Sequence, residues 1–212
     1  MSATKTYIAP SLLQPDNHAL LLIDYQYLQL ITARSHDLER VIASAVLLAK
    51  SAKLFKVPTL LTTGLIKRQG LIREVQAVFP EQVPIDRTNL NSFEDPRIVD
   101  WVRKTERKKL VMAGLWTESC LLISALSALS AGYEVYVVTE ASSSGSHESH
   151  NTAMQRMIQA GCIPIAAGTY LKELQRDWSR TQTAAAVRDI YTAQGTAHGQ
   201  TVKWEGDLIK LD

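Results

Sequence analysis

Short apolar runs alternate with helical segments along the chain, and this alternation constrains the fold more than any other feature. The run ALLLID at 19–24 is uninterrupted and ends in an acid, as expected for a strand buried on both faces of a parallel sheet. Five further segments are predicted to be strands, at 59–64, 83–88, 109–115, 134–141 and 162–167. The last of them contains Pro164, which favours an edge position.

The segments between these strands carry helix signals. Residues 37–56 repeat apolar side chains every three or four positions, and Asp37 can cap that helix. The other predicted helices are 70–78, 95–106, 118–131 (ending at a left-handed Gly132), 147–160 and 168–194. Strands that alternate with helices predict an α/β fold, a three-layer sandwich around a six-stranded, mostly parallel sheet. The common strand order for such a sheet is 3-2-1-4-5-6.

Composition excludes several classes of protein. The chain has 212 residues, 46% hydrophobic and 21% charged, which suits a globular core. A net charge of +2 gives no reason to expect nucleic acid or an anionic membrane as partner. No apolar run approaches the ~18 residues of a membrane span, and the first residues lack a signal-peptide pattern. Two cysteines, Cys120 and Cys162, are not a disulfide framework, so we expect a cytoplasmic protein with free thiols.

Cofactor motifs are missing from the positions where this fold would need them. The loop after the first predicted strand reads DYQYLQL, without the GxGxxG of a dinucleotide site, and no GxxxxGK[ST] occurs. His147 and His150 are three residues apart and could ligate a metal, although a solvated helix start is favoured there. We therefore expect neither a metal nor a cofactor.

Two residues with reactive side chains fall where a doubly wound sheet binds ligands. That crevice lies at the carboxyl ends of the first and fourth strands. Asp24 ends the first, and Cys120 follows the fourth. With Thr117 as N-cap, Cys120 would lie in the first helical turn, where the helix dipole lowers a thiol pKa and free N–H groups can stabilise an oxyanion. Arg87, at the end of the third strand, could hold Asp24 ionised. Cys120 could equally be a packed thiol, and Asp24 a turn cap.

The sequence resembles the isochorismatase-like cysteine hydrolase family, in its YcaC-like branch. The matching stretches are ALLLIDYQ (19–26), VPTLLTT (57–63), VFPEQVPIDRTNLNSFED (78–95), KKLVMAGLWTESCLLISALSALSAGYEVYVVTEASS (108–143), AMQRMIQAGC (153–162) and LQRDW (174–178). The resemblance implies one hydrolase domain over residues 1–212, with its core at about 15–180. It also implies a homo-oligomer, octamers being known in this branch, with contacts through 181–212.

The resemblance also assigns roles to individual residues. It implies a triad of Asp24, Arg87 and Cys120, in which arginine replaces the lysine of most family members. A cis peptide bond is expected at Leu115–Trp116, with an oxyanion hole formed by the amides of Trp116 and Cys120. Four residues are expected to bind substrate, namely Gln26, Asn89, Asn91 and Phe93.

The activity that follows is metal-independent cleavage of an amide-like C–N bond in a small molecule, through a thioester on Cys120. Two alternatives stay open. One is an isochorismatase-type vinyl ether hydrolase, a reaction that does not need the cysteine. The other is a non-catalytic oligomeric binding or scaffold protein that has kept the fold. A thiol pKa below the ordinary ~8.5 would favour the enzyme over the scaffold.

Overall fold

The computed structural model describes residues 7–65, 67, 69–195 and 197–209. Its sheet has six strands in the order β3-β2-β1-β4-β5-β6, and every neighbouring pair is parallel. The strands are β1 (His18–Ile23), β2 (Thr59–Gly64), β3 (Ile85–Arg87), β4 (Lys109–Gly114), β5 (Glu134–Val138) and β6 (Ile163–Ile165). The predicted fold class and strand order are thereby confirmed. The expectations for both ends of the chain fall partly on residues 1–6 and 210–212, which lie outside the described residues.

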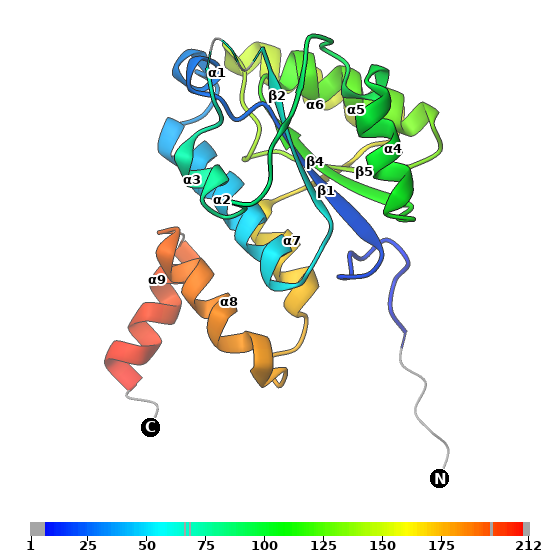
Figure 1. The fold of residues 1–212 in the computed structure, drawn as a ribbon. Coiled ribbons are helices and arrows are strands. Elements are labelled where there is room, and N and C mark those ends of the chain that lie inside the picture. Colours follow the sequence, from blue (N-terminus) through cyan, green and yellow to red (C-terminus); the bar gives the residue numbers. More distant parts are fainter. Residues whose placement is uncertain (1–6, 66, 68, 196, 210–212) are drawn as a thin grey trace.

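Helices cover both faces of the sheet (Figure 1). One face carries α2 (Leu38–Leu54), α3 (Arg73–Gln76) and α7 (Ala167–Gln175), and the other carries α4 (Pro96–Lys104), α5 (Leu122–Ser130) and α6 (His147–Ala160). The alternation of a strand divides the core between these layers. In β1, Leu20 and Leu22 join the cluster under α2 and α7, whereas Leu21 and Ile23 join the cluster under α4, α5 and α6.

Several segments differ from their predicted form. A short helix α1 (Tyr27–Thr32) follows β1 and was not predicted, since six residues are too few to show a period. The predicted helix at 168–194 is two helices, α7 and α8 (Thr181–Ala193), because Arg176 takes a positive φ of 56° that ends α7. The predicted helix at 118–131 opens with a π-helical turn (Thr117–Leu121) before α5 begins.

The C-terminal segment was expected to form an arm on a neighbouring subunit. In the structure it forms α9 (Ala197–Trp204) and a further turn (Glu205–Ile209), and α9 lies beside α8 of its own chain (Figure 1). The approach is close at Gly199, where a Cβ would lie 2.1 Å from the carbonyl oxygen of Tyr191. Only glycine fits at that contact, so the sequence is adapted to this intrachain packing.

The central strands approach closely at the end that bears the candidate site. Gly114, the last residue of β4, is paired with Ile23 of β1, and a Cβ on Gly114 would lie 2.5 Å from the Ile23 carbonyl oxygen. The residues that follow, Asp24 on one strand and Leu115 on the other, therefore leave the sheet side by side. Among the described residues, none of the helices combines the length and the apolar character needed to cross a membrane.

A buried histidine at the other end of β1 makes the stability of the fold depend on pH. His18 is fully buried, its Nδ1 donating to the Gln14 carbonyl (2.7 Å) and its Nε2 accepting from the Tyr170 hydroxyl (3.0 Å). Burial lowers the pKa of His18 to about 4. Because the unfolded chain binds this proton at about pH 6.5, stability is complete above that pH and is lost as pH falls toward 4, by about 3 kcal/mol.

We expect the His18→Gln variant to be less stable than the original protein at pH 7.5 and to show a flatter decline between pH 6.5 and 4.5. Urea unfolding across that range measures both properties. Equal declines in the two proteins would show that His18 does not cause the acid sensitivity.

Candidate active site

Asp24, Arg87 and Cys120 meet at the carboxyl ends of the central strands. Asp24 follows β1 with a positive φ of 58°, Arg87 ends β3, and Cys120 lies in the π-helical turn after β4. All three are buried, with exposed fractions of 1%, 4% and 7%. Gly64 ends β2, the strand between β1 and β3, and a Cβ there would lie 3.6 Å from Oδ2 of Asp24. Gly64 thus lies directly beside the Asp24 carboxyl, and Arg87 reaches that carboxyl across β2.

Asp24 and Arg87 form a buried ion pair. Nη2 of Arg87 donates to Oδ2 of Asp24 at 2.7 Å, and the Thr62 hydroxyl donates to Oδ1 at 3.0 Å. Nη1 of Arg87 donates to the Asn89 carbonyl. Nε of Arg87 is buried and has no hydrogen-bond partner among the residues that the structure describes. Both Asp24 oxygens and both Nη atoms of Arg87 are thus hydrogen-bonded, as the burial of a charge requires, while Nε of Arg87 is left without a described partner.

The Cys120 thiol lies close enough to both charged groups for each of them to shift its pKa. Burial raises the pKa of this thiol to about 11, the neighbouring Asp24 carboxylate adds to the rise, and Arg87 opposes it. Burial also raises the pKa of the Asp24 carboxyl above its ordinary value, against the pull of Arg87. The expectation of a lowered thiol pKa was therefore wrong, because desolvation and a facing carboxylate outweigh a helix start. The thiol pKa therefore does not favour an enzyme over a scaffold, but a protonated thiol beside a carboxylate suits general-base activation.

The turn that carries Cys120 is fixed at its start. The Leu115–Trp116 peptide bond is cis, and the Thr117 N–H donates to the Ser143 carbonyl at 3.0 Å. Thr117 was predicted to cap the helix, which is wrong, because its hydroxyl shares a hydrogen bond of 2.9 Å with Nδ1 of His150. The Trp116 indole N–H donates to the Gln29 carbonyl of α1 at 3.2 Å, so α1 is attached to this turn.

Two of the expected substrate-binding residues have their amide groups occupied within the fold. Gln26 is fully buried, its Oε1 accepting from the Gly64 N–H and its Nε2 donating to the Gln69 carbonyl, both at 2.8 Å. Asn91 accepts from the Phe93 N–H at 3.0 Å and donates to the Ser127 hydroxyl at 2.9 Å. Both side chains shape the loops beside the ion pair.

The other two expected substrate-binding residues lie in the loop after Arg87, and their contact with substrate stays a prediction. Asn89 is exposed and supplies its carbonyl oxygen to Arg87. The ring of Phe93 packs edge-on against Tyr133, with 6.1 Å between centroids. Tyr133 directly precedes β5 and therefore lies at the amino ends of the strands, whereas Asp24 lies at their carboxyl ends. Within the described part of the chain, no group of three or more His, Cys, Asp or Glu side chains could hold a metal ion.

Sequence reasoning missed Thr62, Gly64 and His150 as parts of the site. The register of β2 against β1, which sets Thr62 opposite Ile23, is the signal that could have indicated Thr62. No local pattern links His150 to Thr117, since 33 residues separate them.

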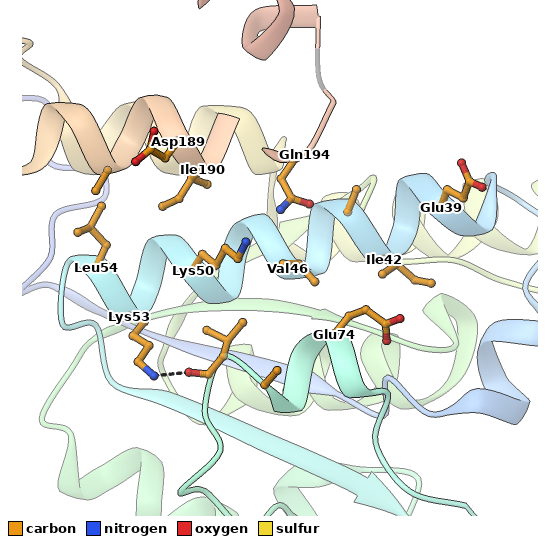
Figure 2. A pocket seen from close by; sticks show the side chains of 14 residues that line it. Glu39, Ile42, Val46, Lys50, Lys53, Leu54, Glu74, Asp189, Ile190 and Gln194 are labelled. Carbon is orange, nitrogen blue, oxygen red and sulfur yellow. Dashed lines mark hydrogen bonds between the residues drawn. The ribbon is translucent and has the colours of Figure 1, made fainter. Parts of the chain in front are cut away.

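A groove lies elsewhere on the molecule, away from Asp24, Arg87 and Cys120. This groove has a volume of about 890 Å³ and lies between α2, α3 and α8. Its apolar floor includes Ile42, Val46 and Ile190 (Figure 2). Lys50, Lys53, Glu39, Glu74 and Asp189 surround this floor. None of Asp24, Arg87 and Cys120 lines the groove. Volume alone therefore does not indicate where the chemistry takes place, and the side-chain geometry does.

A parallel sheet with an acid, an arginine and a cysteine at its carboxyl edge defines the class of the protein. Residues 18–168 match the family model described as the isochorismatase domain. The chain belongs to the isochorismatase family.

Among its relatives is the probable hydrolase YcaC of Escherichia coli, 34% identical over 178 residues, which are 82% of this chain and 84% of that protein. Isochorismatase domain-containing protein 2A of mouse is 29% identical over 153 residues, 68% of each chain.

Solved structures of two YcaC proteins are similar over nearly the whole chain. The Escherichia coli structure, described as an octameric hydrolase of unknown specificity, has a TM-score of 0.87 at 30% identity and covers 97% of this chain and all of its own. YcaC from Pseudomonas aeruginosa, solved with hexane-2,5-diol and covalent acrylamide, has a TM-score of 0.87 at 28% identity and covers 94% of this chain and all of its own. The comparisons support a hydrolase of this family.

Proposed function

We propose that this protein is a metal-independent cysteine hydrolase that cleaves an amide-like C–N bond of a small molecule. The observation that carries the proposal is the buried Asp24–Arg87 ion pair at the carboxyl ends of the strands, with the buried Cys120 thiol near enough for both charges to shift its pKa. A carboxylate that is paired, buried and directed at a thiol is arranged to move a proton. In this proposal Cys120 is the nucleophile, Asp24 the general base and acid, and Arg87 the group that holds Asp24 in place.

The reaction begins with the thiol protonated, since its pKa is about 11. As the sulfur attacks the amide carbonyl, the thiol proton passes to Asp24, and the carbonyl oxygen gains the negative charge. The N–H groups of Trp116 and Cys120 stabilise that oxyanion. Asp24 then returns the proton to the leaving nitrogen, the C–N bond breaks, and an amine and a thioester remain. Asp24 next takes a proton from the water that attacks the thioester carbonyl, and as the C–S bond breaks it passes that proton to the departing sulfur, so that the thiol and the Asp24 carboxylate are regenerated and the acid is released.

Arg87 cannot act as a proton donor or acceptor, because a guanidinium stays charged in proteins. Its role is to fix the carboxylate with one Nη and the Asn89 carbonyl with the other.

A relative supports the nucleophile. The Pseudomonas aeruginosa YcaC structure carries covalently bound acrylamide, an electrophilic amide, in a protein 28% identical to this chain. We propose that Cys120 has the corresponding reactivity here. The octamer of Escherichia coli YcaC supports a homo-oligomer for this chain. We propose that residues 1–212 form one hydrolase domain whose contacts between copies include residues 181–212.

A panel of small primary amides tests this function by ammonia release, combined with acid quenching and mass spectrometry of the enzyme. We expect one or more amides to release ammonia and to leave an acyl group on Cys120. Cys162, also buried and with a pKa also raised to about 11, is the internal control and should stay unmodified. Turnover of a vinyl ether without an acyl-enzyme would favour the isochorismatase-type reaction, and an inert Cys120 would favour a scaffold.

A further inference from the structure

His150 is a buried histidine that the proposed reaction does not use. It lies in the first turns of α6, and its Nδ1 shares a hydrogen bond of 2.9 Å with the hydroxyl of Thr117. Both residues are buried, Thr117 completely. Thr117 stands between Trp116 and Cys120, whose amides form the proposed oxyanion hole. The contact therefore joins α6 to the turn that sets the position of the nucleophile.

The ring of His150 is held from its other side by His36, which lies in the loop before α2. The two rings pack edge to face, with 4.6 Å between centroids. Nδ1 of His36 shares a hydrogen bond of 3.0 Å with the Ser35 hydroxyl, which in turn lies 2.9 Å from the Ser143 hydroxyl. The Ser143 carbonyl accepts from the Thr117 N–H at 3.0 Å, so this series of contacts begins and ends at Thr117.

Two further bonds attach the loop after β5 to the same network. The Ser144 N–H donates to the Ser35 hydroxyl at 3.0 Å, and the Ser144 hydroxyl donates to Glu118, the residue after Thr117. Thr117 is thereby held through its backbone by the loop after β5 and through its side chain by α6. The hydrogen bond between Thr117 and His150 is therefore part of a network that also includes Ser35, Ser143 and Ser144.

His150 stays uncharged near neutral pH. Burial, together with the neighbouring His36 and His147, lowers its pKa to about 4. The pKa of His36 is also lowered, first by burial and then by Arg40 and His147, while Glu140 and Asp37 oppose this change. A neutral ring can keep one tautomer, and hence one hydrogen bond to Thr117, over the whole physiological range.

We infer that His150 is a positioning residue for Cys120, acting through Thr117 to hold the nucleophile against Asp24. The inference rests on the proposed function, but it concerns the geometry of the thiol and not the identity of the substrate. Small displacements of a nucleophile are costly, since about 1 Å can reduce a rate by about 100-fold.

The test is the rate at which acrylamide alkylates Cys120, followed by peptide mass spectrometry, with Cys162 as internal control. Four variants form two matched pairs. Thr117→Val removes the hydroxyl and Thr117→Ser keeps it, while His150→Ala removes the ring and His150→Asn keeps a hydrogen-bonding atom near the place of Nδ1. We expect Thr117→Val and His150→Ala to slow Cys120 by about tenfold to 100-fold and to leave Cys162 unchanged. The serine and asparagine variants should recover most of the rate.

The double variant Thr117→Val/His150→Ala separates positioning from a general loss of stability. Since both residues act through one bond, its rate should match that of the slower single variant, whereas independent effects would multiply. Thermal unfolding of each variant shows that the folded state is assayed. Wild-type rates in Thr117→Val and His150→Ala, or multiplying effects, would overturn the inference. A reactive Cys120 without amide turnover would overturn only the proposed function, and an unreactive Cys120 in the unmodified protein would overturn both.

Discussion

Turnover of any amide substrate is expected to fall by at least about 1000-fold when Cys120 is replaced by alanine, because no other group can form the thioester. The fold should remain, since the change removes only one sulfur atom and the Asp24–Arg87 pair keeps its hydrogen bonds with Thr62 and Asn89. Steady-state rates and thermal unfolding of the purified variant measure the two effects separately.

The matched control is Cys162→Ala, which removes the other buried thiol and should keep nearly full activity. Asp24→Asn provides a second comparison, because it leaves the sulfur but removes its base. We expect that variant to lose turnover, because the proton acceptor and donor is gone, but to keep acrylamide labelling of Cys120, because loss of the carboxylate lowers the thiol pKa and leaves Arg87 near the sulfur. Full activity in Cys120→Ala would show that catalysis is not covalent, and would favour a vinyl ether hydrolase in which the cysteine takes no part.

The fold could be predicted largely because its strands are buried on both faces. The run at 19–23 is apolar throughout because helices cover both sides of the sheet, and that pattern differs from an amphipathic helix. The helices were harder to place where tertiary contacts override the local signal. Arg176 ends α7 with a positive φ, and its guanidinium donates to the Leu13 carbonyl at 2.9 Å, a contact that no local pattern could indicate.

The site was predictable in position but not in its electrostatics. The ends of strands place Asp24 and Cys120 at one edge of the sheet in any fold of this order, and the structure brings them together there. The direction in which the pKa of the Cys120 thiol shifts could not be predicted, because the shift depends on how completely the surroundings exclude water and on the facing Asp24 carboxylate. The roles of Gln26 and Asn91 were hidden for a similar reason. A polar side chain near a site binds either substrate or backbone, and only the three-dimensional structure shows which hydrogen bonds are already made.

Loss of the Arg87 charge is expected to have the largest effect on stability. In Arg87→Met the Asp24 carboxylate stays buried without its partner, which typically costs about 3–5 kcal/mol of unfolding free energy. The effect should also depend on pH. Arg87 lowers the pKa of Asp24 against the effect of burial, so its removal raises that pKa further. A group with a raised folded pKa binds its proton more tightly in the folded state, and stability is then lost as pH rises from about 4 through the folded pKa.

The destabilisation of Arg87→Met should therefore be greater at pH 8 than at pH 5, which urea unfolding at both values would measure. In the double variant Asp24→Asn/Arg87→Met the charge is absent, so part of the lost stability should return and the pH dependence should weaken. Arg40→Met is the matched control, because Arg40 pairs with Glu140 at 3.5 Å while the two side chains are 63% and 24% exposed. A surface pair of this kind contributes less than about 1 kcal/mol. Equal losses in the Arg87 and Arg40 variants would mean that burial does not give the Asp24–Arg87 pair its importance, and the view of Arg87 as the group that holds the base in place would fail.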